Sequence, residues 1–197
     1  MRTLCIPLIG GLLAACAHSG AVAPAPQMVS RTAWGAAAPV SAMIAHTPSY
    51  ITIHHTGTRS NANRTLEQKL KGLQTFSQRE DSLAGGRKKP AWPDVPYHYY
   101  IDITGRIGVG RDVRFKGDTN TEYDPTGHIL VVVEGNFEEE QPTAAQMESL
   151  RRMVKWLASQ WKVPAERIQS HKDYARTQCP GVNLYREMEG LRALVKR

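Results

Sequence analysis

The sequence predicts an α/β fold, in which a central mixed β-sheet is flanked by helices within a single domain. Two observations carry this prediction. Short β-branched or apolar runs alternate along the chain with segments of helical periodicity, and this alternation is typical of sheets covered by helices. Thr104-Gly105 joins two of the runs through a short turn, which predicts one antiparallel hairpin.

The strands are predicted from runs with little polar content. In chain order they are residues 50–54, 97–103, 106–110, 128–133 and 168–170. The run at 128–133 is apolar almost throughout, as expected for a strand that is covered on both faces. The hairpin connects 97–103 to 106–110, so we expect those two strands to be neighbours in the sheet.

Three helices are predicted between and after these strands. Apolar residues recur at helical spacing from about Thr65, and a closing helix is expected over 184–195. The clearest helix begins at Thr143, with Gln146 three residues later in the pattern of a capping box. One of its faces carries Met147, Leu150, Met153, Val154, Leu157 and Trp161. We interpret it as a packing helix.

The first 15 residues predict an export signal. Arg2 supplies a positive charge, and the apolar run at 4–13 is shorter than the ~20 residues that a bilayer span needs. Residues 13–16, Leu-Ala-Ala-Cys, resemble the lipobox of bacterial lipoproteins. This resemblance implies cleavage before Cys16 and a lipid on that cysteine. Because Ala17 follows, it also implies an outer-membrane lipoprotein facing the periplasm. The alternative is an ordinary secretory signal that ends in a chance cysteine.

The domain organisation follows from this reading. Residues 1–15 are expected to be the signal and 16–29 a lipidated flexible tether of small residues and proline. Residues 30–197 then form the folded domain, whose size of about 165 residues suits a single core. The sequence specifies no oligomeric state.

The charge balance is basic. Loss of Arg2 with the signal takes the formal net charge from +7 to +6. A basic chain suits an anionic partner, but an exported protein rarely meets nucleic acid, and the basic residues form no long tract. We therefore expect cell-wall polymers and the membrane to be the partners, and no nucleic acid.

Cys179 is the one thiol that is left after the signal is removed and Cys16 is lipidated. Disulfides are favoured outside the inner membrane, yet this cysteine has no partner in the chain. Burial, a metal or nucleophilic chemistry would each explain it.

His54, His171 and Cys179 are candidate ligands of a metal ion. Zn²⁺ accepts imidazole nitrogen and thiolate sulfur, and a catalytic zinc keeps three protein ligands and one open position. Both histidines end predicted strands, from which side chains distant in sequence can converge. On spacing alone, a buried thiol with two surface histidines explains the same residues.

Several short motifs, in this order, change that balance. They are Ser-Arg-Thr-Ala-Trp-Gly-Ala at 30–36, Ile-Thr-Ile-His-His-Thr at 51–56, Trp-Pro-Asp-Val-Pro-Tyr-His-Tyr-Tyr-Ile at 92–101, Gly-Val-Gly-Arg at 108–111 and Thr-Gln-Cys-Pro-Gly at 177–181. Together they resemble the type 2 N-acetylmuramoyl-L-alanine amidase family, which includes peptidoglycan recognition proteins and phage lysozyme-like amidases. The resemblance covers about residues 30–185.

This resemblance implies a zinc amidase domain. It would hydrolyse the amide bond between N-acetylmuramic acid and L-alanine of the stem peptide, with peptidoglycan or muropeptides as substrate. The implied zinc ligands are His54, His171 and Cys179. Tyr97 is implied to contact the nucleophilic water, and Thr177 to lie near the tetrahedral intermediate. Phage-type relatives carry lysine where this chain has Thr177.

Several roles stay open. In one branch of the family, the aspartate branch, the third zinc ligand is an aspartate and a glutamate acts as base; that glutamate aligns with Val132 here. Glu134 is a substitute base or a solvated strand end. Asp173 either orients His171 or caps the following turn. The loop with Arg87-Lys88-Lys89, Trp92 and Asp94 contacts substrate or is a mobile surface loop.

Two other functions compete with the amidase. One is a binding module of the same fold that recognises wall fragments without cutting them; loss of a zinc ligand would mark it. The other is a thiol enzyme that uses Cys179 with His171, for which activity would be metal-independent and sensitive to alkylation.

Overall fold

The computed structural model describes residues 23–195, and its centre is a six-stranded sheet in the order β1-β6-β5-β7-β2-β8. Its strands are Met28–Val29 (β1), Tyr50–His55 (β2), Tyr99–Ile101 (β5), Ile107–Val109 (β6), His128–Val133 (β7) and Ile168–Ser170 (β8). The pair β5–β6 is antiparallel and the other neighbours are parallel. The predicted mixed sheet and its hairpin are confirmed.

The helix predicted to begin at Thr143 does so, and the one predicted from about Thr65 begins there too. The helices are Arg31–Trp34 (α1), Leu66–Ser77 (α2), Ala144–Trp161 (α3), Val182–Tyr185 (α4) and Met188–Ala193 (α5), with 3-10 turns at Ala84–Gly86 (η1), Ala165–Arg167 (η2) and His171–Asp173 (η3). Thr65 and Thr143 each close a capping box with the glutamine three residues on. The single closing helix expected over 184–195 is instead two short helices, α4 and α5.

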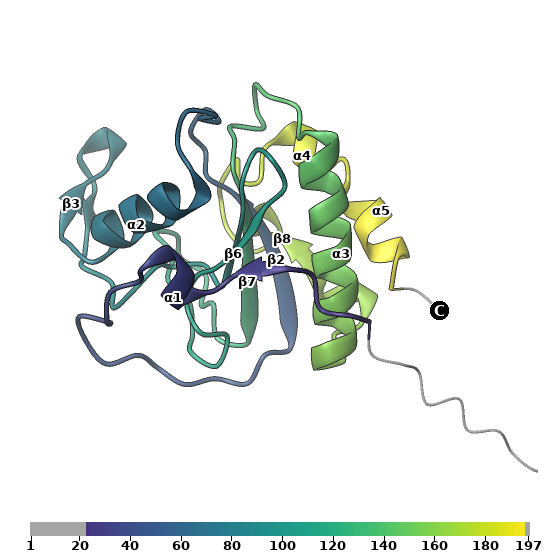
Figure 1. The fold of residues 1–197 in the computed structure, drawn as a ribbon, viewed down its shortest axis with the longest axis horizontal. Helices are drawn as coiled ribbons and strands as arrows, with labels where there is room; N and C mark the ends of the chain where they lie inside the picture. The colour runs from purple at the N-terminus through teal and green to yellow at the C-terminus, as the bar shows by residue number, and fades with distance from the viewer. Residues whose placement is uncertain (1–22, 196–197) are drawn as a thin grey trace, which may run out of the picture.

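The two faces of the sheet are covered differently (Figure 1). The long helix α3 and helix α5 pack on one face, where their apolar residues meet Ile51, Ile53 and Val131 in the larger core. Helix α2 covers part of the other face, where Leu66 and Leu70 pack against Val132. Because side chains alternate along β2, Ile53 enters the larger core while His54 projects from the opposite face.

The N-terminal boundary predicted at residue 30 is too late. Met28 and Val29 pair with Ile107 and Gly108 as the edge strand β1, and the backbone N–H of Ala23 donates to Ser159 Oγ over 3.1 Å. Residues 23–29 therefore belong to the folded domain rather than to a flexible tether. The predicted signal, Cys16 and the rest of the tether lie outside the described residues.

Across residues 23–195, no helix is both long enough and apolar enough to cross a bilayer.

Candidate metal centre

The register of the sheet brings the two candidate histidines together. Strands β2 and β8 are parallel, and Ile53 pairs with Ser170. His54 is the next residue of β2 and His171 is the first residue after β8, so both lie at the carboxyl edge of the sheet, where ligand sites of open α/β sheets lie. Their ring centroids are 4.5 Å apart.

The segment after β8 returns Cys179 to the same place. Lys172 N–H donates to the carbonyl of Cys179 over 2.9 Å, which closes the loop, and His55 N–H donates to Cys179 Sγ over 3.3 Å. The chain then passes so close to Phe137 that a Cβ on Gly181, whose φ is +86°, would lie 2.4 Å from that residue's backbone. A glycine after Pro180 is what lets the loop dock at this depth.

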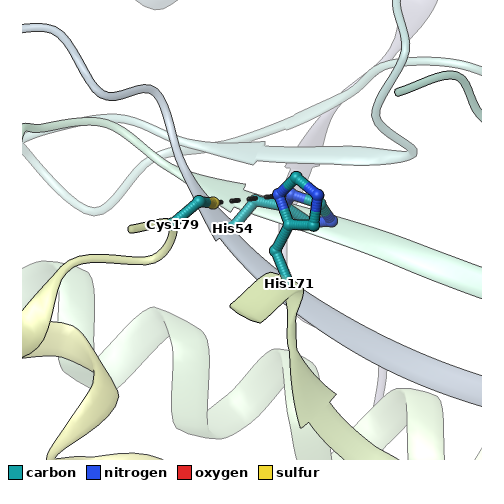
Figure 2. A group of neighbouring side chains, drawn as sticks. All are labelled: His54, His171 and Cys179. Atoms are coloured by element: carbon teal, nitrogen blue, oxygen red, sulfur yellow. Dashed lines mark hydrogen bonds between the residues drawn. The ribbon is translucent and has the colours of Figure 1, made fainter. Parts of the chain in front are cut away.

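The three side chains point toward one another (Figure 2). One candidate ligand atom from each of His54, His171 and Cys179 lies within 4.8 Å of the other two, and all three residues are buried. Cys179 Sγ is 3.6 Å from His54 Nδ1. The residues predicted from sequence as ligands are therefore brought together from two strand ends and a loop.

Burial keeps these groups uncharged. It lowers the pKa of His54 well below its ordinary value, with His171 as the next cause, and it lowers the pKa of His171 to about 4. Burial also raises the pKa of the Cys179 thiol to about 12. Neutral imidazoles are the form that binds metals. A reactive cysteine needs the reverse shifts, a lowered thiol pKa beside a charged histidine, so the thiol-enzyme interpretation loses support.

The donor set fits zinc. Ordinary Zn–S and Zn–N bonds at a tetrahedral angle separate sulfur from nitrogen by about 3.5 Å, close to the separation of Cys179 Sγ and His54 Nδ1. Within residues 23–195, His54 Nε2 is buried without a hydrogen-bond partner, and its Nδ1 has the thiol as its partner. A zinc ion bound at Nδ1 would replace its weak contact with the thiol, and it would leave Nε2 as it is.

Comparison with known proteins now gives the family. The model of the N-acetylmuramoyl-L-alanine amidase family matches residues 45–182. The chain belongs to this family. It therefore has the fold and the peptidoglycan-related function class that the sequence motifs implied.

Relatives of this amidase-family chain include both recognition proteins and enzymes. Peptidoglycan-recognition protein SC2 of Drosophila simulans is 26% identical over 164 residues, which cover 82% of this chain and 84% of that protein. The endolysin N-acetylmuramoyl-L-alanine amidase LysCS from Clostridium intestinale URNW has 25% identity and a TM-score of 0.67, covering 88% and 99% of the two chains. Drosophila peptidoglycan recognition protein SD, at 23% identity, shares the fold with a TM-score of 0.71, covering 83% and 93%.

Tyr97 and Thr177 both lie beside the cluster. The Tyr97 ring centroid is 5.3 Å from that of His54, and burial, followed by the nearby Cys179, raises the pKa of its phenol. Thr177 Oγ1 accepts the N–H of Cys179 over 3.2 Å, which leaves its own hydrogen free to donate. Both hydroxyls are neutral donors next to the candidate ligands.

Thr121 and Tyr123 were missed by the sequence reasoning. Thr121 Oγ1 lies 2.7 Å from His171 Nε2, and the Tyr123 ring centroid is 5.2 Å from that of His171. Both belong to the irregular segment before β7, which has no periodic pattern. Its one signal was a tyrosine in a polar run of threonines just before a buried strand.

Glu134 is neither a solvated strand end nor a free base. Its side chain is 4% exposed and accepts from Lys69 Nζ at 2.7 Å and from the N–H groups of Asn61 and Ile103, each at 2.9 Å. The oxygens are engaged on all sides by donors from outside the cluster. Val132, which aligns with the glutamate of the aspartate branch, is buried against α2.

Asp173 caps the turn. Its Oδ2 accepts the N–H and hydroxyl of Ser170, each over 2.8 Å, and Tyr185 donates to its Oδ1. No hydrogen bond from Asp173 to His171 occurs in the described chain, so the capping alternative holds and the orienting one is wrong.

The loop expected to contact substrate or to be mobile is anchored in the core by Lys89, Trp92 and Asp94, whereas Arg87 and Lys88 are exposed and their role stays open. Strand β3 (Asp81–Ser82) pairs with β4 (Lys88–Lys89), and Lys89 is 1% exposed with its ammonium on the carbonyls of Ser77, Arg79 and Pro90. Trp92 packs under that ammonium at 4.6 Å. Asp94 is also buried, in an ion pair with Arg31 of 2.8 Å. Lys89, Trp92 and Asp94 are structural.

Proposed function

We propose that this chain is a zinc-dependent N-acetylmuramoyl-L-alanine amidase that releases stem peptides from peptidoglycan. The observation that carries the proposal is the convergence of His54, His171 and Cys179 in one buried cluster. A module that only binds wall fragments has no use for three zinc donors at one point, whereas a zinc hydrolase requires them.

The cluster's own residues are prepared for this chemistry. The two neutral imidazoles and the thiol, after losing its proton, would hold Zn²⁺. The bound ion supplies a Lewis acid for the scissile carbonyl and an activated water. Tyr97 keeps its proton because burial raises the pKa of the phenol. It can therefore donate a hydrogen bond to the oxyanion that develops on the substrate, as can the free hydrogen of Thr177.

The test is hydrolysis of purified peptidoglycan by the chain from residue 16, with Cys16→Ser so that no lipid is attached. We expect free stem peptides, identified by mass, that disappear with a chelator and return with zinc. Cys179→Ser should be inactive. Its folding is checked by comparing its metal-free melting curve with that of the parent chain.

Two outcomes would reject the proposal in different ways. Zinc binding and wall binding without any cleavage would favour the recognition module. Cleavage that survives the chelator but is lost on alkylation of Cys179 would favour the thiol enzyme.

We also propose that the domain is held at the outer membrane, facing the periplasm, by a lipid on Cys16. The motif at residues 13–16 supports this. Mass spectrometry of the mature N-terminus is expected to find a lipidated Cys16, and Cys16→Ala to release the protein from membranes. A mature chain that is cleaved elsewhere and carries no lipid would favour the ordinary secretory signal.

A further inference from the structure

Thr121 makes the one side-chain hydrogen bond that the described residues offer to His171. Its Oγ1 lies 2.7 Å from His171 Nε2, although the two residues are 50 positions apart. Thr121 also lies 2.8 Å from the hydroxyl of Thr119, to which its own N–H donates over 3.2 Å. The imidazole thus ends a short line of two threonine hydroxyls.

The direction of these bonds follows from the chemistry of the cluster. If Nδ1 of His171 is the nitrogen that faces the metal, it must carry a lone pair, so the proton of the neutral ring is on Nε2. Nε2–H then donates to Thr121 Oγ1. The hydroxyl hydrogen of Thr121 is left free, and Thr119 Oγ1 is there to accept it. The Nε2–H of His171 and the hydroxyl of Thr121 each then have an acceptor.

We propose that Thr121 is a positioning residue, which holds His171 in the Nε2–H tautomer and in the ring orientation that turns Nδ1 toward His54 and Cys179. The inference rests on the proposed function, because it assigns a partner to one of the proposed zinc ligands. Outer hydrogen bonds of this kind orient metal-binding histidines and raise their basicity.

The surrounding segment is anchored well enough to hold that threonine in place. Glu122, the next residue, accepts the N–H of Arg176 from the loop that carries Cys179. The Tyr123 ring leans on His171 and stacks on Tyr174, with centroids 5.6 Å apart and planes 20° from parallel. The segment therefore contacts His171 at Nε2 and at its ring, and is tied to the adjoining loop.

The experiment measures zinc affinity by competition with a chromophoric chelator, using the chain from residue 16 with Cys16→Ser. Thr121→Val keeps the shape but removes the hydroxyl, and we expect zinc to bind about 10- to 100-fold more weakly. Thr121→Ser restores the hydroxyl and should restore the affinity. Thr126→Val is the matched control from the same segment, since its hydroxyl bonds to exposed Asp124, and should bind zinc as the parent does.

A second readout follows the tautomer itself in the metal-free protein, by ¹⁵N NMR of the imidazole nitrogens. His171 should be in the Nε2–H form in the parent chain and in Thr121→Ser, and in a mixture of tautomers in Thr121→Val. Metal-free melting curves report whether any variant has lost its fold. If Thr121→Val is less stable, a parent-like melting curve for Thr121→Ser would assign that loss to the missing hydroxyl.

The outcomes separate this inference from the proposed function. Zinc affinity and tautomer unchanged in Thr121→Val would overturn the inference and leave the metal centre intact. An equal loss in Thr126→Val would overturn it as well, since the effect would belong to the whole segment. If the parent chain binds no zinc, the proposed function fails, while the NMR comparison still decides whether Thr121 sets the tautomer.

Discussion

Two buried polar regions of this molecule differ in how fully the protein satisfies them. One lies around α2, where Lys69 pairs with Glu134 and Lys89 is inserted beneath the helix end. The other is the cluster of His54, His171 and Cys179. Both are removed from solvent and both are built from residues distant in sequence.

Around α2, hydrogen-bond partners surround each charged head. The Glu134 carboxylate receives three N–H donors, and the Lys89 ammonium contacts three carbonyls. In the cluster, by contrast, His54 Nε2 has no partner within residues 23–195, and Cys179 Sγ is shared between one imidazole and the backbone of His55. An unpartnered atom alone does not indicate a ligand, because Ser77 Oγ at the end of α2 is also buried without a partner within residues 23–195. What indicates a ligand in the cluster is the convergence of three metal-binding side chains. Burial alone does not distinguish the two regions.

The largest expected effect is on the free energy of unfolding and comes from the buried pair of Lys69 and Glu134. Lys69→Met would leave the Glu134 carboxylate buried without its cation, and breaking a buried pair in this way costs about 3–5 kcal/mol of the free energy of unfolding. Urea denaturation in a chelator measures the loss. Zinc affinity should stay that of the parent chain, because the pair lies outside the cluster. A loss of about 1 kcal/mol or less, as for exposed pairs, would show that the pair is solvated and would break the comparison.

The next effect concerns the cluster of His54, His171 and Cys179. Zinc bound only by the native state should add about 4 kcal/mol to the free energy of unfolding when free zinc is 1,000 times its dissociation constant. Cys179→Ser should remove most of this gain, while Lys69→Met should keep it despite its lower starting stability. Thermal melts with and without zinc give the answer. Equal stabilisation of parent and Cys179→Ser would mean that zinc binds elsewhere.

A smaller effect concerns His98, which is buried as His54 is but lies outside the cluster. His98 is fully buried but has both nitrogens bonded, one to Leu130 N–H and one to the carbonyl of Phe115, and burial lowers its pKa to about 3. Between pH 6.5 and 3 the unfolded chain binds a proton there that the folded chain does not. Stability is therefore complete above pH 6.5 and falls as the pH falls, by about 1.4 kcal/mol per pH unit for this group.

His98→Asn tests that slope. Asparagine keeps an acceptor near the position of Nδ1 but cannot titrate, so the fall in stability between pH 6 and 5 should be shallower by that amount. Urea denaturation in a chelator at the two pH values measures it. An unchanged slope would mean that His98 is protonated in the folded protein.

The sequence predicted the parts of the fold that have local signals. The apolar runs at 50–54 and 128–133 became central strands, and the helical periodicity from about Thr65 and the capping box at Thr143 became the two main helices. The edge strand β1 was missed because a pair of only two residues, Met28 and Val29, shows no alternation. The prediction of a single closing helix was wrong because no local signal in the sequence marks the interruption between Tyr185 and Met188.

For the site, the donor types made His54, His171 and Cys179 candidates, and the resemblance to the amidase family favoured them over a buried thiol with two surface histidines. The parallel register explains why two of them meet. Glu134 was misjudged because its cation, Lys69, comes from 65 positions earlier and leaves no mark beside it in the sequence. Thr121 was missed for the same reason, since an irregular segment carries no period from which the direction of a side chain can be read.

The cluster joins Cys179 to His54 across 125 positions of the chain. Folding must close this long loop before the donors meet, and loop closure of that length is slow relative to local contacts. An ion whose bonds form only after the main folding barrier would link the first central strand to the C-terminal part of the domain in the native state alone. It would lengthen the lifetime of the folded state by slowing unfolding, with little change in the rate of folding.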